Sequence, residues 1–498
     1  MKRALLAVAL ALMLVVAGCN TTDQGGDSTT VEPTGEPTDE MTTAQTTAEQ
    51  TETGTTTSGG EDEEDDEREE QEEPCEYRSE EGDLVQVQGA CLGFDANQVY
   101  LNVMEMAGVE LDTGPSVRSL SPEQTNPYTF DQFGFSNESF QAVMGIAPNG
   151  TPDVYVAGYA SPQTGPDGSV EVDVVMRYID ADGGEGRPQG PEEAEITLAH
   201  EYLHAIQFYE GSQDRLAANL TSEGVNLGDV ETSLVEGSAV YFESEYQEQY
   251  MDRDAASRNV SAWANSSPFS MYQLGPYVMG ERYTKFRVNS TSEFQTLYDN
   301  PPISMEQIMH NHMPDEERPR NLTVERGQDS VWNHYDTSTR GELFLRSSLR
   351  AGVSGPRAAA GAEGWGADRA MTFRNQSYSS AGNYKYGYAW TLRFDNASEQ
   401  DEFRGIFGDW LESRGPLTDG VYRMDEDHTY RMVEISDETV VVLAGHERFT
   451  TQTVATGNAS HVTVTMTDAD QTSSVQSDDD DDEERLVTAQ SGAVRATV

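Results

Sequence analysis

The sequence predicts an α+β protein whose folded part lies between two highly polar ends. Helical periodicity dominates the middle of the chain, whereas short strands around a single helix dominate the last third. Residues 20–74 and the run SDDDDDEER (477–485) contain too few apolar side chains to offset the entropy of ordering. We therefore predict a disordered, acidic N-terminal stalk (19–74) and a disordered, acidic C-terminal tail (466–498).

The chain is strongly acidic. Its 498 residues carry a formal net charge of −57, with 88 acidic and 31 basic residues, and lysine occurs only as Lys2, Lys285 and Lys385. This balance argues against nucleic acid as a partner, because phosphate binding needs clustered Lys and Arg. An acidic, lysine-poor composition is typical of proteins from salt-loving microbes, since molar salt reduces the Debye length to about 3 Å and carboxylates then barely repel one another.

The first 19 residues have the features of an export signal. Lys2 and Arg3 precede the apolar run 4–17, which is shorter than the roughly 20 residues that span a bilayer. The ending V-A-G-C resembles a lipobox, which predicts removal of residues 1–18 and lipidation of Cys19. The alternative is a plain signal peptide with an incidental cysteine. We expect a lipid-anchored protein on the outer face of the cytoplasmic membrane of a haloarchaeon.

The other two cysteines, Cys75 and Cys91, fit the same compartment. They are expected to form a disulfide, because disulfides persist outside the cell. A zinc-binding pair is the alternative, although the CxxC spacing is not present. N-x-S/T triplets, such as those at Asn137 and Asn219, are compatible with a glycosylated surface protein.

The folded part begins with a mixture of strands and a helix. LVQVQG (84–89) and SVEVDVVMRYI (169–179) alternate apolar and polar residues, and VYVAGYA (154–160) is rich in strand-forming residues, so all three are predicted strands. FDANQVYLNVMEMAGV (94–109) repeats apolar residues at helical spacing and is a predicted helix.

Three longer helices are predicted next. The segment 191–211 starts with Pro191, carries three glutamates in its first turns and ends at Gly211, which are the usual start and stop signals of a helix. Apolar residues at helical spacing predict two more helices at 229–250 and 272–286.

The pattern then changes, which predicts a separate C-terminal module (381–465) after a first domain (75–380). The module is smaller and of the α+β class. Its predicted helix is EQDEFRGIFGDWLESRG (399–415), and its predicted strands are 384–394, 421–424, 430–435 and 439–445.

The stretch TLAHEYLHAIQF (197–208) holds His200 and His204 in a chain with only eight histidines. On a helix, residues four apart project from the same face and can bind one zinc ion at about 2.0–2.1 Å. Glu201 lies beside them, where a carboxylate can take a proton from a zinc-bound water, and this makes H-E-x-x-H a hydrolase pattern. The alternative is an amphipathic helix that happens to carry two histidines.

A catalytic zinc site takes three protein ligands and leaves a fourth position open. The candidate third ligand is Glu236, which lies in the apolar helical segment LVEGSAVYFE (234–243). Its neighbours Gly237 and Ala239 are small and would let this helix approach the first one closely. The alternative is an ordinary solvated glutamate.

H-E-x-x-H followed by E-G-x-A-x-Y resembles the gluzincin metallopeptidases of the peptidase MA type. VAGYASPQTG (156–165), PPISMEQIMH (301–310) and GWGADRAM (364–371) are similar to segments of a set of archaeal and bacterial surface proteins with the same motif order. The resemblance covers roughly 150–375. It implies a zincin-like fold with Glu201 as the catalytic base and a zinc ion bound by His200, His204 and Glu236.

The sequence departs from thermolysin-like gluzincins at Val240, where those enzymes have an aspartate that orients a zinc-bound histidine. Another acidic side chain must then orient the imidazole. His310 and Tyr241 are candidates for stabilising an oxyanion, with purely structural roles as the alternative. GWGADR (364–369) is predicted to be a tight turn in which Asp368 is structural.

Together these features predict an extracellular, lipid-anchored zinc metallopeptidase that acts on proteins or peptides near the cell surface. Zincins usually bind their peptide along a sheet edge, and the segment 169–179 is the candidate edge strand. The alternative is a non-catalytic surface protein that uses the zinc-containing domain as a binding scaffold. The presence of Glu201 argues against it, because a structural zinc has no use for a neighbouring base. A solute-binding lipoprotein is a third interpretation, but the repeated strand–helix units that it requires are not found.

Overall fold

The computed structural model describes most of the chain between Tyr77 and Met466. The exceptions are residues 78, 89–91, 122–123, 125–138, 148–156, 178, 180–188, 221–225, 252, 254–258, 328–330 and 376–383. The predicted signal peptide, stalk and tail, and all three cysteines (Cys19, Cys75 and Cys91), lie outside the described residues. Within the described part, none of the helices is both long enough and apolar enough to cross a bilayer.

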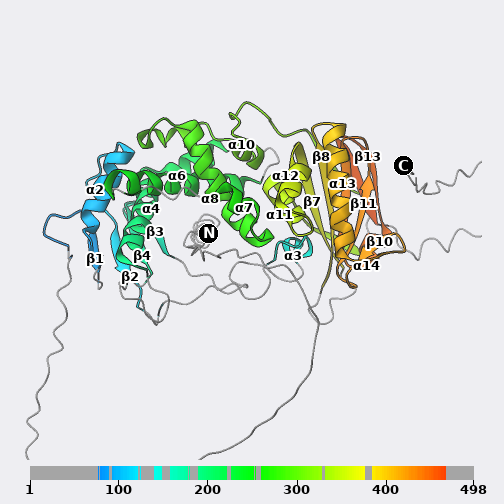
Figure 1. Ribbon diagram of the computed structural model, residues 1–498, viewed down its shortest axis with the longest axis horizontal. Helices are drawn as coiled ribbons and strands as arrows, with labels where there is room; N and C mark the ends of the chain where they lie inside the picture. Colours follow the sequence, from blue (N-terminus) through cyan, green and yellow to red (C-terminus); the bar gives the residue numbers. More distant parts are fainter. Residues whose placement is uncertain are drawn as a thin grey trace, which may run out of the picture.

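The described chain confirms the α+β class, with a helical middle region and a C-terminal antiparallel sheet (Figure 1). The first sheet has four strands in the order β1-β2-β4-β3. β1 (Gln86–Gln88), β2 (Ser116–Ser119) and β4 (Val170–Met176) are parallel, and β3 (Gly158–Thr164) is antiparallel to β4 at the edge. α2 (Ala96–Ala107) and α4 (Pro191–Tyr209) share one apolar core with this sheet.

The expected edge strand is wrong. Residues Val170–Met176 of this segment form β4, which lies inside the sheet, and β1 and β3 are the two edges among the described strands. The consecutive residues Val174, Val175 and Met176 are all buried, so both faces of β4 are covered. Consecutive burial of this kind is typical of an internal strand.

Two long helices, α6 (Leu227–Tyr250) and α8 (Pro268–Arg287), cross in close contact above α4. The contact is made by two glycines, because a Cβ atom added to Gly237 would lie 2.2 Å from the backbone carbon of Gly280. Gly237 therefore allows α6 to approach α8, not α4 as the sequence suggested. The shorter helices of this region are α5 (Ser212–Asn219), α7 (Val260–Ala264), η4 (Thr291–Glu293), α9 (Thr296–Asp299) and α10 (Met305–His310).

The C-terminal sheet has seven antiparallel strands in the order β6-β7-β8-β12-β11-β10-β9. It starts at Trp332 and pairs β7 with β8, so it crosses the boundary expected after residue 380. The change of pattern near residue 383 did not indicate the first two strands of this sheet, which lie before it. The strands are β6 (Trp332–Ser338), β7 (Trp365–Asn375), β8 (Lys385–Phe394), β9 (Leu417–Thr418), β10 (Val421–Arg423), β11 (Thr429–Glu434) and β12 (Thr439–Gly445).

Both faces of this sheet are covered. One face packs against α11 (Gly341–Arg350), α12 (Gly355–Ala362) and α13 (Ala397–Arg414). The other face packs against α14 (Glu447–Gln452) and a three-stranded sheet of order β13-β14-β5. The bounds of this small sheet are β13 (Thr453–Asn458), β14 (His461–Met466) and β5 (Thr323–Arg326).

A short segment from the first half of the chain completes the C-terminal core. α3 (Phe140–Val143) lies between β2 and β3 in the sequence but beside α11 and α12 in space (Figure 1). The ring of Phe140 stacks on Phe344 and Tyr388 at centroid distances of 5.4 and 4.9 Å. Tyr430 donates a hydrogen bond of 2.7 Å to the carbonyl of Val143. A helix from the first half of the chain therefore contributes to the core of the C-terminal sheet.

The GWGADR segment is a strand rather than a tight turn. Only Gly364, with φ +71°, makes the turn, and β7 begins at the next residue. Asp368 is structural, as predicted, because it is fully buried and accepts four hydrogen bonds. The donors are the backbone N–H groups of Arg340 and Gly341 and the indoles of Trp365 and Trp390.

Candidate metal centre

The helix α4 carries the H-E-x-x-H motif between the four-stranded sheet and α6. Pro191 occupies its first turn together with Glu192 and Glu193, which suit the positive end of the helix dipole. The helix is continuously buried from Leu198 to Gln207. Its two histidines are therefore buried residues on one face of a covered helix, with 3% of His200 and 1% of His204 exposed.

The helix α6 supplies the third member of the group. Glu236 is 2% exposed and lies in the buried half of this helix. His204 Nε2 lies 3.1 Å from His200 Nε2, and Glu236 Oε2 lies 3.4 Å from the first histidine and 3.5 Å from the second. The predicted triad is thus brought together as a buried group that could hold a metal ion.

The partners of Gln207 fix the tautomer of His204. The amide nitrogen of Gln207 lies 3.2 Å from the carbonyl oxygen of Val235 and also donates to Ser238 and Tyr298. A backbone carbonyl can only accept, so the amide oxygen of Gln207 must face His204 Nδ1, 2.8 Å away. His204 therefore carries its proton on Nδ1 and directs the lone pair of Nε2 toward the triad.

His200 is oriented from behind by a carboxylate. Its Nδ1 lies 3.4 Å from Glu243 Oε2, an ion-pair distance that is long for a hydrogen bond. His200 Nδ1 has no hydrogen-bond partner within the described residues, but the nearby carboxylate favours a proton on Nδ1, which leaves Nε2 facing the triad. Sequence reasoning missed both Gln207 and Glu243. The signal was present, because Gln207 follows His204 by three residues and Glu243 follows Glu236 by seven, and both spacings keep residues on one helix face.

This arrangement demands a positive charge at its centre. Burial favours the neutral imidazole, but the contacts with Glu236 and Glu243 raise the pKa of His200 to about 10. Burial likewise opposes ionisation of Glu236, yet the two histidines lower its pKa to about 2. Two imidazole nitrogens and a carboxylate that all point to one position need either an additional proton or a metal ion between them.

The dimensions of the triad fit a metal ion. Two ligands held about 2.0–2.1 Å from a tetrahedral zinc ion lie about 3.3 Å from each other. The three edges of the triad, from 3.1 to 3.5 Å, bracket this value. The donor set of two imidazoles and one carboxylate is the kind that zinc accepts in hydrolytic sites. Glu236 Oε2 also has no hydrogen-bond partner, which leaves its lone pairs available for a cation.

Glu201 lies between the triad and the edge strand β3. A Cβ atom added to Gly158 would lie 3.2 Å from Glu201 Cγ, so the absence of a side chain at Gly158 lets the strand approach this close. The backbone N–H of Ala160 donates to the Glu201 carboxylate, while Glu201 Oε2 is buried without a partner. Burial raises the pKa of Glu201 above its ordinary value. Its position and its basicity both suit a group that accepts a proton.

The structure gives His310 and Tyr241 other partners than the triad. His310 Nε2 lies 2.9 Å from Glu342 Oε1, and this contact raises the pKa of His310. Tyr241 lies under Lys285, whose Nζ is 5.9 Å from the centre of the ring. Among the contacts of the described residues, none joins His310 or Tyr241 to the triad. These contacts favour the structural roles that the sequence left open.

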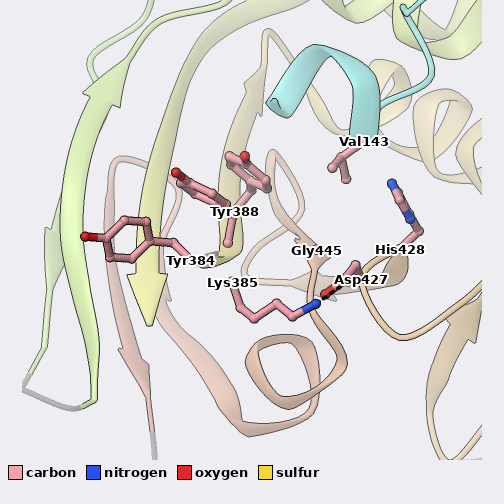
Figure 2. Close-up of a pocket in the computed structure, with 8 residues that line it drawn as sticks. Val143, Tyr384, Lys385, Tyr388, Asp427, His428 and Gly445 are labelled. Carbon is pink, nitrogen blue, oxygen red and sulfur yellow. Dashed lines mark hydrogen bonds and ion pairs between the residues drawn. The ribbon is translucent and has the colours of Figure 1, made fainter. Parts of the chain in front are cut away.

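A second hollow occurs in the C-terminal module, at the start of β8 (Figure 2). Val143, Tyr384 and Tyr388 give it an apolar lining. Its polar side chains are paired with each other, because Lys385 Nζ lies 2.5 Å from Asp427 Oδ2. None of the residues that line this hollow belongs to the group of His200, His204 and Glu236.

Comparisons with known proteins bear on the C-terminal module alone. Residues 329–455 match the model of a family described as a domain of unknown function, DUF8575. None of the curated proteins and none of the solved structures compared with the chain matches it. The matched segment begins almost at the start of β6, in agreement with the extent of the seven-stranded sheet. It does not include the triad.

Proposed function

We propose that this protein is a zinc-dependent peptidase. In this proposal His200, His204 and Glu236 bind the ion and Glu201 acts as the general base. The observation that carries it is the convergence of three buried ligand atoms, with His204 held in the zinc-binding tautomer, next to a second buried acid, Glu201, that has one free oxygen. When bound, zinc supplies Lewis acidity, which polarises a carbonyl and acidifies water.

Glu201 performs the proton transfers. Its oxygen Oε2 has no partner, so it is free to accept a proton from the attacking water and to pass it to the amine that leaves. The Ala160 N–H holds the carboxylate in place during this transfer. The raised pKa of Glu201 makes it a better base than an exposed carboxylate, whose ordinary pKa is about 4.3.

The edge strand β3 suits an extended peptide substrate. Gly165 N–H donates to Ser169 and Arg177 N–H donates to Ala157, so the odd-numbered residues of this strand bond to β4. The even-numbered residues 158 to 164 therefore turn their backbone groups away from β4, and among these groups the Ala160 N–H already donates to Glu201. A peptide can pair with such an edge as an additional strand. Pro162 lacks an N–H group, so this ladder is interrupted two residues beyond Ala160.

One observation favours a different role. None of the four residues His200, Glu201, His204 and Glu236 is more than 3% exposed. A closed site of this kind suits a structural zinc ion in a non-catalytic surface protein, in which the fourth position would be filled by the protein. The free oxygen of Glu201 favours the peptidase, because a structural site gains nothing from an unpaired buried acid.

The setting of the site is part of the same proposal. We infer a protein that acts on proteins or peptides outside the cell, held at the membrane by a lipid on Cys19. The N-terminal sequence and the acidic composition support this location and a high-salt environment. A direct check is mass spectrometry of the mature N-terminus, which should begin with a lipid-modified cysteine.

The function is tested by zinc analysis and peptide cleavage in molar salt, with the wild type, Glu201→Gln and the control Glu192→Gln. Glu192 lies on the same helix and is exposed. We expect all three proteins to bind one zinc ion, and we expect cleavage by Glu201→Gln to fall by about 10²–10⁴-fold. A wild type that binds no zinc overturns the proposal. A wild type that binds zinc but cleaves no peptide supports the scaffold.

A further inference from the structure

The two histidines of the triad are held from behind by different kinds of side chain. His204 is backed by Gln207, a neutral amide that is completely buried. His200 is backed by Glu243, a carboxylate whose side chain is 23% exposed. We propose that Glu243 is the positioning residue for His200 and replaces the acid that is missing at Val240. This inference rests on the zinc site of the proposed function.

Helix geometry explains why Glu243 can position His200. Seven residues make almost two full turns of an α-helix, so Glu243 lies on the same face of α6 as Glu236 and about 10 Å further along its axis. The long glutamate side chain then reaches the rear of His200, while Glu236 reaches the front. Val240 lies one turn from Glu236, and with 1% exposure it fills apolar space that a charged group would not tolerate.

Glu243 and Gln207 should affect their histidines differently, because one is a carboxylate and the other is an amide. A carboxylate that accepts a hydrogen bond from an imidazole increases the basicity of the opposite nitrogen, and an amide does so much less. Glu243 lies at an ion-pair distance of 3.4 Å from His200 Nδ1, so its charge increases the basicity of this imidazole and makes His200 the stronger ligand. Gln207 is tied to Val235, Ser238 and Tyr298, so its removal leaves several buried groups without partners and destabilises the fold itself.

Glu243 is well placed for a test because it is only partly buried. Its loss leaves a gap that water can fill, so the fold should survive the substitution. Glu245→Ala is a matched control. Glu245 lies on the same helix and is also partly exposed, and its replacement removes the same charge. Its side chain lies near Lys285 and Glu248, not near the triad.

The experiment measures zinc affinity by competition with a chelator in molar salt. We expect Glu243→Ala to bind zinc about 10–100-fold more weakly than the wild type and Glu245→Ala to bind it equally well. Glu243→Gln keeps an acceptor but loses the charge, so its affinity should lie between those of the wild type and Glu243→Ala. The cobalt-loaded Glu243→Ala protein should also show an altered visible spectrum, because the His200 ring is no longer held.

The outcomes separate this inference from the function on which it rests. If the wild type binds zinc, and Glu243→Ala matches Glu245→Ala in affinity and in cobalt spectrum, the positioning role is overturned and the zinc site stands. If the wild type binds no zinc, both fall together. Circular dichroism of each variant in the same salt verifies the fold, and Glu243→Gln provides the comparison if Glu243→Ala unfolds.

Discussion

The C-terminal sheet and the helical region both bury carboxylates, and they treat them in opposite ways. Asp368 is fully buried in β7, and it accepts hydrogen bonds from two backbone N–H groups and two indoles. Glu236 is as well buried, but its Oε2 faces two imidazole nitrogens and accepts no hydrogen bond. The hydrogen bonds of Asp368 are satisfied within the protein, whereas Glu236 and its two histidine neighbours form a group that could hold a metal ion.

The largest effect in this comparison is expected from Asp368→Ala. The substitution leaves four buried donors without an acceptor and opens a cavity beside Trp390, so the free energy of unfolding should fall by about 3–5 kcal/mol. Urea denaturation in molar salt measures the change. The control is Asp401→Ala on α13, an exposed position that should change stability by less than about 0.5 kcal/mol. Equal stability of the two variants would contradict the structural role of Asp368.

Zinc binding to the triad should stabilise the folded protein. At a free concentration of 100 times its dissociation constant, a ligand that binds only the folded state stabilises it by about 2.7 kcal/mol. We expect zinc to raise the unfolding temperature of the wild type and to leave that of His204→Ala unchanged. His446→Ala is the control, because His446 is a buried histidine that caps α14 in the other region. Its zinc response should equal that of the wild type, and a response in His204→Ala would contradict the assignment.

The smallest of the three effects is expected for a third buried carboxyl group, that of Glu306 in α10. Burial and the nearby Glu342 carboxylate raise its pKa to about 10. A carboxyl group whose pKa is raised in the folded state stabilises the fold at low pH, and this stabilisation is lost as the pH rises from about 4.5 toward 10. Glu306→Gln removes the titration.

The measurement is the unfolding free energy of the wild type and Glu306→Gln at pH 5 and pH 6. Relative to the variant, the wild type should lose about 1 kcal/mol between these values. Glu402→Gln, at an exposed position of α13, serves as the control and should follow the wild type. Parallel pH profiles of the wild type and Glu306→Gln would show that Glu306 is solvated in solution.

The sequence was most informative where all the residues that predict a feature lie within one helix. Pro191 and Gly211 marked the ends of α4, and the spacing of His200 and His204 followed from helical geometry alone. Glu236 was found because a glutamate in an apolar helix requires an explanation. Its meeting with α4 is a matter of tertiary packing, and the sequence misassigned that contact when it gave Gly237 the wrong neighbouring helix.

The sequence was less informative where a residue depends on distant parts of the chain. Whether a strand is at an edge depends on its neighbours in the sheet, so β3 and β4 could not be distinguished by alternation alone. The same is true of His310, whose partner Glu342 lies on another helix. Glu243 is the exception, because its place on the face of Glu236 could have been calculated from the helical repeat.

The position of α3 bears on how this protein can be divided. The family match begins at residue 329, yet the aromatic cluster of Phe344, Tyr388 and Trp390 is closed by Phe140, which lies in α3 well before the match. β5 and β14 also lie outside the match. A fragment cut at the limits of the match would expose this apolar cluster to water and tend to aggregate. Where a relative contains the module without the preceding region, it must therefore close the same gap with a side chain of its own.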